Sequence, residues 1–255
     1  MKAVILAGGY GTRLGEETIF KPKPLVEIGG MPILWHIMKI YSFYGINDFI
    51  ICLGYKGNLI KNFFLDYSHS VNNIEINLDK DSIKFINKRK EPWTITLIDT
   101  GGDTMTGGRV KKVSEYINET FLLTYGDGVS NVNIKNLIEF HKNKKRISTV
   151  TAVRPDARFG GIKIGTDMVT SFKEKPQSGE GWINGGFFVF EPKFLDYIDD
   201  DSTVLEHEPL EIAAKNGQLS AFKHEGFWQC MDTIRDRDYL NKLWNENNAK
   251  WKIWK

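Results

Sequence analysis

Two kinds of apolar pattern alternate along the chain. Short runs with almost no polar interruption are found at residues 3–6, 49–53, 121–125, 148–153 and 183–190. Runs of this length suit strands that are buried on both faces of a parallel sheet. Between them, apolar residues recur at helical spacing over 32–44, 58–67 and 134–141. Because strand and helix alternate, the pattern predicts an α/β fold with a doubly wound, mainly parallel sheet.

The rest of the chain departs from this rhythm. Residues 73–100 and 162–175 alternate apolar and polar positions. Some of the strands in 73–100 should form a hairpin beside the main sheet, and residues 162–175 should form another hairpin. Shorter elements follow, namely helices at 192–198 and 208–216, strands at 219–224 and 227–231, and a helix capped by Asp232-Thr233 that runs to about Trp244. No linker, repeat or low-complexity segment interrupts the sequence. We therefore expect one domain over residues 1–255, with halves of about 1–130 and 131–255.

Composition changes this picture little. The chain has 255 residues, of which 41% are hydrophobic and 26% charged, with a net charge of +2. These values are typical of a globular domain, and the small charge argues against a nucleic-acid partner. No apolar stretch approaches the roughly 20 residues of a membrane span, and the first residues show no signal-peptide pattern. We therefore expect a cytoplasmic protein with no membrane partner.

Cysteine and histidine add little predicted chemistry. Cys52 and Cys230 lie far apart in sequence and form no Cys-x-x-Cys motif, so both are expected to be reduced thiols. For Cys230, a catalytic role is the alternative to a packing role. The five histidines show no metal-ligand spacing.

Glycines crowd the turn after the first predicted strand. Gly8, Gly9 and Gly11 have no β-carbon, so backbone N–H groups there can approach an anion closely. Thr12 and Arg13 add a hydroxyl and a guanidinium that can bind phosphate oxygens in pairs. A P-loop would need Lys-Ser/Thr here, and a dinucleotide fingerprint would need glycine in place of Arg13. The spacing predicts a different polyphosphate-binding turn, and a tight turn without a ligand is the alternative.

Further candidate charges follow along the chain. Lys21 and Lys23 each precede a proline, which should keep both lysines extended and outside a helix. They either point back to the phosphates or lie in a solvated loop. Asp127 stands between two glycines after a predicted strand, where ligands bind in open α/β sheets, and such a carboxylate suits Mg²⁺. Its alternative is a residue chosen for turn geometry. The glycine-rich segment 100–109 is either a second binding loop or a surface loop before a helix at 109–116.

Taken together, these motifs resemble those of the sugar-phosphate nucleotidylyltransferases. The shared motifs, in order along most of the chain, are Leu6-Ala7-Gly8-Gly9-Tyr10-Gly11-Thr12-Arg13-Leu14, Lys23-Pro24, Gly126-Asp127-Gly128, Glu174-Lys175-Pro176 and Asn184-Gly185-Gly186. The cytidylyltransferase branch that uses glucose 1-phosphate is similar at Glu91-Pro92-Trp93, residues 104–109, Arg158-Phe159-Gly160, and Gly226-Phe227-Trp228 with Met231-Asp232-Thr233. The chain departs from the family pattern at Tyr10, Met31 and Cys230, and the last of these adjoins a proposed metal ligand.

The resemblance implies a Rossmann-like mixed, mainly parallel sheet flanked by helices, with an inserted β-hairpin and a C-terminal sugar-binding portion. It implies conversion of CTP and α-D-glucose 1-phosphate to CDP-glucose and pyrophosphate with Mg²⁺. It also implies a place in lipopolysaccharide O-antigen biosynthesis and a homo-oligomer such as a homohexamer. A sugar phosphate is already anionic, so its attack on the α-phosphorus needs alignment and charge cancellation rather than a general base.

The same resemblance gives roles to individual residues. Arg13 and Lys23 are the expected catalytic residues, near the β- and γ-phosphates and the α-phosphate respectively. Asp127 and Asp232 are the expected metal ligands. The expected nucleotide-binding residues are Leu6, Ala7, Gly8, Gly9, Gly11, Thr12, Arg13, Lys23, Thr104, Arg109 and Asp127. The expected sugar-phosphate-binding residues are Gly160, Glu174, Lys175 and Asn184.

Two other functions stay open at this point. One is the same chemistry with UTP or dTTP, against which the match at residues 104–109 argues. The other is a non-catalytic regulatory homologue that binds a nucleotide sugar. Retention of Arg13, Lys23, Asp127 and Asp232 together argues against that second function.

Overall fold

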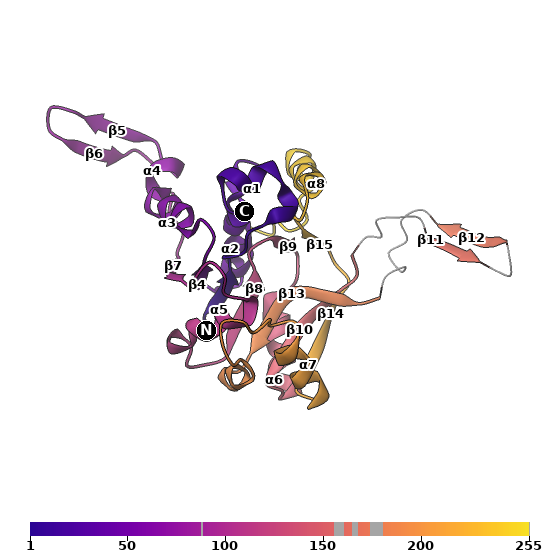
Figure 1. Ribbon diagram of the computed structural model, residues 1–255. Helices are drawn as coiled ribbons and strands as arrows, with labels where there is room; N and C mark the ends of the chain where they lie inside the picture. Colours follow the sequence, from indigo (N-terminus) through magenta and orange to yellow (C-terminus); the bar gives the residue numbers. More distant parts are fainter. Residues whose placement is uncertain (88, 156–160, 165–167, 174–180, 255) are drawn as a thin grey trace.

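A seven-stranded sheet forms the centre of the computed structural model, which describes residues 1–255 except 88, 156–160, 165–167, 174–180 and 255 (Figure 1). Its strands, in spatial order, are β14 (Leu219–His224), β10 (Ser148–Val153), β13 (Ile183–Phe190), β8 (Phe121–Tyr125), β1 (Ala3–Leu6), β4 (Asp48–Leu53) and β7 (Thr94–Asp99). β13 runs antiparallel to both of its neighbours, and the other neighbouring pairs are parallel. The mixed, mainly parallel sheet is therefore confirmed.

Strand β1 shows why the apolar runs are uninterrupted. Ala3 and Ile5 pack into one core and Val4 and Leu6 into the other, and each is at most 8% exposed. The first core is covered by α2 (Ile33–Phe43), α3 (Gly57–Leu65), α6 (Ile134–Lys144) and α8 (Ile234–Asn245). The second is covered by α5 (Thr106–Lys112), η4 (Pro192–Tyr197) and α7 (Glu208–Lys215). A strand between two cores has no position left for a polar side chain.

Short elements connect this frame. They are η1 (Thr12–Leu14), α1 (Glu16–Phe20), η2 (Lys23–Leu25), β2 (Glu27–Ile28), β3 (Met31–Pro32), α4 (Tyr67–Val71), η3 (Ser114–Tyr116), β9 (Gly128–Ser130) and β15 (Trp228–Cys230). β9 and β15 pair with each other in antiparallel fashion, away from the main sheet. This pair joins the middle of the chain to its C-terminal part.

Both predicted hairpins are present. β5 (Ile74–Asn77) pairs with β6 (Ser82–Phe85), and β11 (Gly161–Ile164) pairs with β12 (Val169–Lys173), each in antiparallel fashion. The β5–β6 hairpin projects away from the central sheet beyond α4 (Figure 1). The side chains of Ile74, Ile76 and Ile83 are therefore exposed, and Leu78 in its turn is 90% exposed.

Three local predictions were wrong. Lys23 opens the 3-10 turn η2, in which the Val26 N–H donates to the Lys23 carbonyl, although Pro24 follows it. The helix expected at 109–116 begins earlier, at Thr106, because the N–H groups of Gly107 and Gly108 both donate to the carbonyl of Thr203. Pro32 is the N-cap of α2 rather than its first residue.

The C-terminal tryptophans complete the first core around a histidine. His36 on α2 is fully buried, its Nε2 pairs with the Ile28 carbonyl at 2.8 Å, and Trp244 and Trp251 pack against its ring. Burial lowers the pKa of His36 to about 4, so the ring is neutral at physiological pH. No helix in the described part of the chain combines the length and apolar character needed to cross a membrane.

Candidate active site

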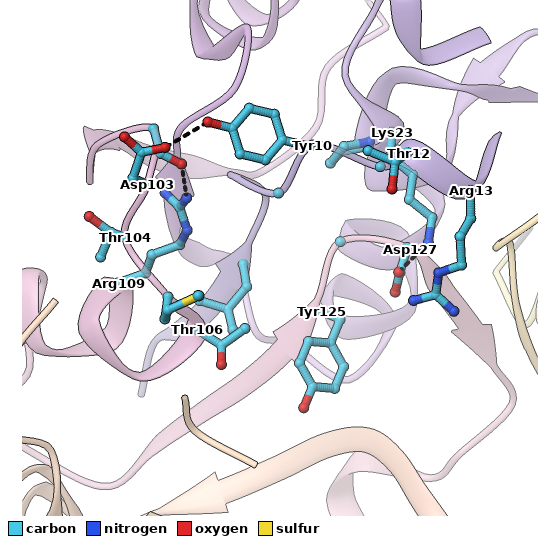
Figure 2. Close-up of a pocket in the computed structure, with 17 residues that line it drawn as sticks. Tyr10, Thr12, Arg13, Lys23, Asp103, Thr104, Thr106, Arg109, Tyr125 and Asp127 are labelled. Carbon is cyan, nitrogen blue, oxygen red and sulfur yellow. Dashed lines mark hydrogen bonds and ion pairs between the residues drawn. The ribbon is translucent and has the colours of Figure 1, made fainter. Parts of the chain in front are cut away.

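A cavity of about 590 Å³ opens at the carboxyl ends of β1 and β8. The two strands are parallel neighbours with Leu6 opposite Tyr125, so the glycine turn and Gly126-Asp127 emerge side by side. In Figure 2, Arg13, Lys23 and Asp127 lie on one side of this cavity, and Asp103, Thr104 and Arg109 lie on the other. The site thus stands where open α/β sheets bind ligands.

The glycine turn is shaped by two of its glycines in different ways. Gly11 has a φ of 66°, a left-handed conformation that favours glycine, and the Thr18 hydroxyl donates to its carbonyl at 3.2 Å. At Gly8 a β-carbon would lie 2.2 Å from Nη1 of Arg109, so a guanidinium takes that space. Gly9 is exposed and has nothing within 4 Å of such a β-carbon.

Lys23 joins the two predicted metal ligands. Its Nζ lies 2.6 Å from Oδ2 of Asp127 and 2.6 Å from Oδ1 of Asp232. Arg13 reaches the same cluster, with Nη1 at 2.8 Å from Oδ2 of Asp232. The Lys23 side chain is only 11% exposed, whereas that of Arg13 is 76% exposed. Two cations and two anions therefore meet at one edge of the cavity.

Ion pairing outweighs burial in its effect on the pKa values of Lys23 and Asp232. Burial opposes the charged form of Lys23, but Asp127 and Asp232 raise its pKa above the ordinary value. Burial also opposes the charged form of Asp232, but Lys23 and Arg13 hold its pKa below the ordinary value. Lys23 and Asp232 are therefore both ionised at neutral pH.

Strands β9 and β15 bring Asp127 and Asp232 together across the chain. β9 follows Asp127, β15 precedes Asp232, and Gly128 pairs with Cys230. The Met231 N–H donates to the Asp127 carbonyl at 2.8 Å. Thr233 is the N-cap of α8 and forms a capping box with Asp236, which also accepts from the Asp232 N–H. Backbone pairing and a helix cap thus fix both carboxylates.

The donor set fits a hard divalent cation. The two carboxylate oxygens approach the same ammonium, so they lie within twice 2.6 Å of each other. Mg²⁺ is held by one or two carboxylates and completes its shell with phosphate oxygens and water. The lysine ammonium lies between the two carboxylates that would hold such an ion. Among the described residues, no group of three or more His, Cys, Asp and Glu side chains is placed to hold a metal alone.

Both cysteines are free thiols, as expected. Burial and the nearby Asp232 raise the pKa of Cys230 to about 12, and its Sγ lies 3.7 Å from Oδ2 of Asp232. A thiol with that pKa is protonated and a poor nucleophile at neutral pH. The arrangement favours the packing role for Cys230.

Arg109 ties together the loops on the far side of the cavity. It is 4% exposed and makes five hydrogen bonds, to the carbonyls of Gly8, Leu53, Gly101 and Gly102 and to the Thr100 hydroxyl, at 2.7–3.1 Å. The guanidinium thus fixes the glycine turn relative to residues 100–102. These hydrogen bonds stabilise the loops that form this wall of the cavity.

The other predicted nucleotide-binding residues surround the same cavity. Leu6, Thr12 and Thr104 line it, while Ala7 and Gly8 are buried behind its wall. Lys112 donates to the Thr104 hydroxyl at 3.3 Å and pairs with Asp201 at 2.6 Å. The 200–205 segment therefore holds Thr104 at the cavity edge.

A second cavity, of about 280 Å³, adjoins the first and shares Arg13, Tyr125 and Asp127 with it. Asn184 of β13 lines it, and the Asn184 Nδ2 donates to the Tyr125 hydroxyl at 3.3 Å. Gly160, Glu174 and Lys175 lie outside the described residues. The structure thus places one predicted sugar-phosphate residue, Asn184, in the cavity that Arg13, Asp127 and Asp232 also line.

Sequence reasoning gave no site role to several residues of the second cavity. Glu206 receives hydrogen bonds from the hydroxyls of Tyr125 and Thr106, and Trp228 Nε1 donates to the Gly185 carbonyl at 2.7 Å. Glu206 stands in an irregular segment with no motif around it. The available signal for Tyr125 was its position as the last residue of a strand before Gly126-Asp127.

Comparison with known proteins identifies the class of enzyme to which the chain belongs. The chain belongs to the nucleotidyl transferase family, whose family model matches residues 2–236. It is 54% identical to the glucose-1-phosphate cytidylyltransferase of Salmonella typhimurium over 100% of both chains. Among solved structures, HddC from Yersinia pseudotuberculosis is 25% identical with a TM-score of 0.68, covering 95% of this chain and 99% of that one. CTP:phosphocholine cytidylyltransferase from Streptococcus pneumoniae is 21% identical with a TM-score of 0.62, covering 95% and 98%, and shows the shared fold.

Proposed function

We propose that this enzyme converts CTP and α-D-glucose 1-phosphate to CDP-glucose and pyrophosphate. The observation that carries the proposal is the cluster of Arg13, Lys23, Asp127 and Asp232 at the junction of two cavities, in a chain that matches a glucose-1-phosphate cytidylyltransferase along its whole length. The larger cavity would hold the nucleotide and the smaller one the sugar. The two reacting phosphates would then meet beside the cluster.

The reaction needs positioning more than proton transfer. The phosphate of glucose 1-phosphate is anionic near neutral pH, so it can attack the α-phosphorus of CTP without a general base. The enzyme must hold the attacking oxygen in line with the leaving pyrophosphate and offset the negative charge that gathers there. Fixed cations at the junction of the cavities meet this need.

Arg13 and Lys23 are the proposed catalytic residues. The exposed guanidinium of Arg13 would leave Asp232 for the β- and γ-phosphates, and the ammonium of Lys23 would bind the α-phosphate region. Asp127 and Asp232 would hold Mg²⁺. When bound there, the ion supplies positive charge that offsets the charge of the phosphate oxygens.

The remaining assignments extend this proposal. Leu6, Ala7, Gly8, Gly9, Gly11, Thr12, Thr104 and Arg109 would form the nucleotide site, with the last two near base and ribose. Gly160, Glu174, Lys175 and Asn184 would form the sugar-phosphate site. The exposed apolar side chains of the β5–β6 hairpin support a homo-oligomer, because contact between copies would cover them. A cytoplasmic location and a role in lipopolysaccharide O-antigen biosynthesis complete the proposal.

Two radiolabels test where the bond breaks. With Mg²⁺ and glucose 1-phosphate, label from [α-³²P]CTP is expected in CDP-glucose and label from [γ-³²P]CTP in pyrophosphate, because the sugar phosphate attacks the α-phosphorus. Thin-layer chromatography of the products measures both. Omitting the sugar phosphate should leave both labels in CTP. Label that stays in CTP with all components present would favour the non-catalytic, nucleotide-sugar-binding alternative.

A further inference from the structure

Glu206 is a carboxylate on the wall of the smaller cavity whose partners are neutral hydroxyls. The Tyr125 hydroxyl donates to its Oε1, and the Thr106 hydroxyl donates to its Oε2 at 2.6 Å. Tyr125 ends β8, Thr106 begins α5, and Glu206 lies on the 200–206 segment. One side chain thus joins elements that line both cavities.

Each hydrogen bond around Glu206 has a defined donor and acceptor, with the Glu206 carboxylate as the final acceptor. Asn184 donates to the Tyr125 hydroxyl, which in turn donates to Glu206, while Oδ1 of Asn184 accepts from the Gly186 N–H at 2.9 Å. Burial and the neighbouring Glu206 raise the pKa of Tyr125, so its hydroxyl keeps the proton that it donates. The Thr106 hydroxyl is held as well, because it accepts from the Leu205 N–H at 2.9 Å. The orientation of the carboxylate is therefore fixed before any ligand arrives.

The charge environment of Glu206 differs from that of the other carboxylates in this cavity. Asp127 and Asp232 pair with Lys23, but no lysine or arginine in the described part of the chain forms an ion pair with Glu206. An ionised carboxylate has about four acceptor sites, and two are taken by Tyr125 and Thr106. The remaining sites can accept from a neutral hydroxyl, whereas a phosphate there would be repelled. This chemistry fits the hydroxyl-bearing part of a sugar.

We propose that Glu206 is a specificity-determining residue for the sugar, and that it accepts a hydrogen bond from one hydroxyl of the hexose ring. The inference rests on the proposed function, since it takes a hexose 1-phosphate as the occupant of the smaller cavity. Asn184 is linked to Glu206 by the Tyr125 hydroxyl, so the two side chains can hydrogen-bond to neighbouring hydroxyls of the sugar. A sugar that lacks the hydroxyl leaves a fixed carboxylate without its partner, and such a loss is penalised strongly.

The test measures kcat/KM for glucose 1-phosphate and for its 2-, 3-, 4- and 6-deoxy analogues. In the wild-type enzyme, one analogue should react at least about 10-fold less efficiently than glucose 1-phosphate, as expected where a site hydrogen-bonds a substrate hydroxyl. Glu206→Gln should lower kcat/KM for glucose 1-phosphate by about 10-fold or more but leave the value for that one analogue nearly unchanged. The KM for CTP should stay within about twofold, because Glu206 lines the smaller cavity and not the larger one proposed for the nucleotide. Glu211→Gln, on the exposed side of α7, is the matched control and should behave as wild type.

Three outcomes separate the possibilities. An equal loss for every sugar in Glu206→Gln would mean a purely structural role and would overturn the inference. If the wild-type enzyme had the same kcat/KM for glucose 1-phosphate and all of its deoxy analogues, the inference would be overturned. This measurement needs no variant, so it still applies if Glu206→Gln fails to fold. Absence of turnover with glucose 1-phosphate in the wild-type enzyme would overturn the proposed function and this inference with it.

Discussion

Lys23→Met is expected to lower kcat for pyrophosphate release by about 10²-fold or more, the range seen when one preorganised charge donor is removed from an active site. Methionine keeps the apolar stem that packs on Gly11 but removes the ammonium between Asp127 and Asp232. The ammonium also occupies the position proposed for Mg²⁺. The Mg²⁺ concentration for half-maximal rate should therefore not rise in this variant. Steady-state rates at saturating CTP and glucose 1-phosphate, over a series of Mg²⁺ concentrations, measure both quantities.

Lys21→Met is the matched control for this variant. Lys21 lies two residues away and pairs with Glu27 at 3.4 Å, outside both cavities. Its rate should stay near that of wild type. A Lys23→Met enzyme with wild-type kcat would show that the ammonium serves folding or spacing alone and would remove Lys23 from the mechanism.

Asp127→Asn is expected to lower kcat/KM by about 10²-fold or more and to raise the Mg²⁺ concentration for half-maximal rate by at least about 10-fold. Asparagine keeps the shape of the side chain but removes the charge that attracts the ion. The Mg²⁺ concentration for half-maximal rate should therefore rise in Asp127→Asn, whereas it should not rise in Lys23→Met. The two variants together therefore separate metal binding from the ion pair that both residues share.

Asp196→Asn, an exposed change on η4, controls for the loss of one negative charge. It should leave both the rate and the Mg²⁺ dependence unchanged. If Asp127→Asn lost activity with an unaltered Mg²⁺ dependence, Asp127 would act by holding Lys23, and its proposed role as a metal ligand would be wrong.

The strands of the central sheet were predictable because burial on both faces leaves a plain signal. Residues 3–6, 121–125, 148–153 and 183–190 form strands over the predicted bounds. In contrast, α1 (Glu16–Phe20) carries Ile19 and Phe20 exposed and is too short to show a helical face. The start of α5 at Thr106 depends on the backbone of residues 200–203, nearly a hundred positions away. Local patterns carry no trace of such a contact.

Some residues of the candidate site likewise have a local signal in the sequence, whereas others are brought together only by the fold. The glycine turn and Gly126-Asp127-Gly128 could be found because each couples a strand end to an unusual local composition. The meeting of Lys23 with Asp232 could be inferred only from a resemblance, since it joins residues 209 positions apart through the β9–β15 pair. Glu206 had no local signal at all, and its importance depends on Tyr125 and Thr106 in the folded chain. Arg109 was expected near the nucleotide, but its bonds to four carbonyls emerge only in three dimensions.

The rate of pyrophosphate release with each nucleoside triphosphate, at fixed glucose 1-phosphate and Mg²⁺, tests the central claim most directly. The account predicts the highest kcat/KM with CTP, lower values with UTP and dTTP, and no release when glucose 1-phosphate is left out. Equal or higher efficiency with UTP or dTTP would contradict the assignment to cytidylyl transfer.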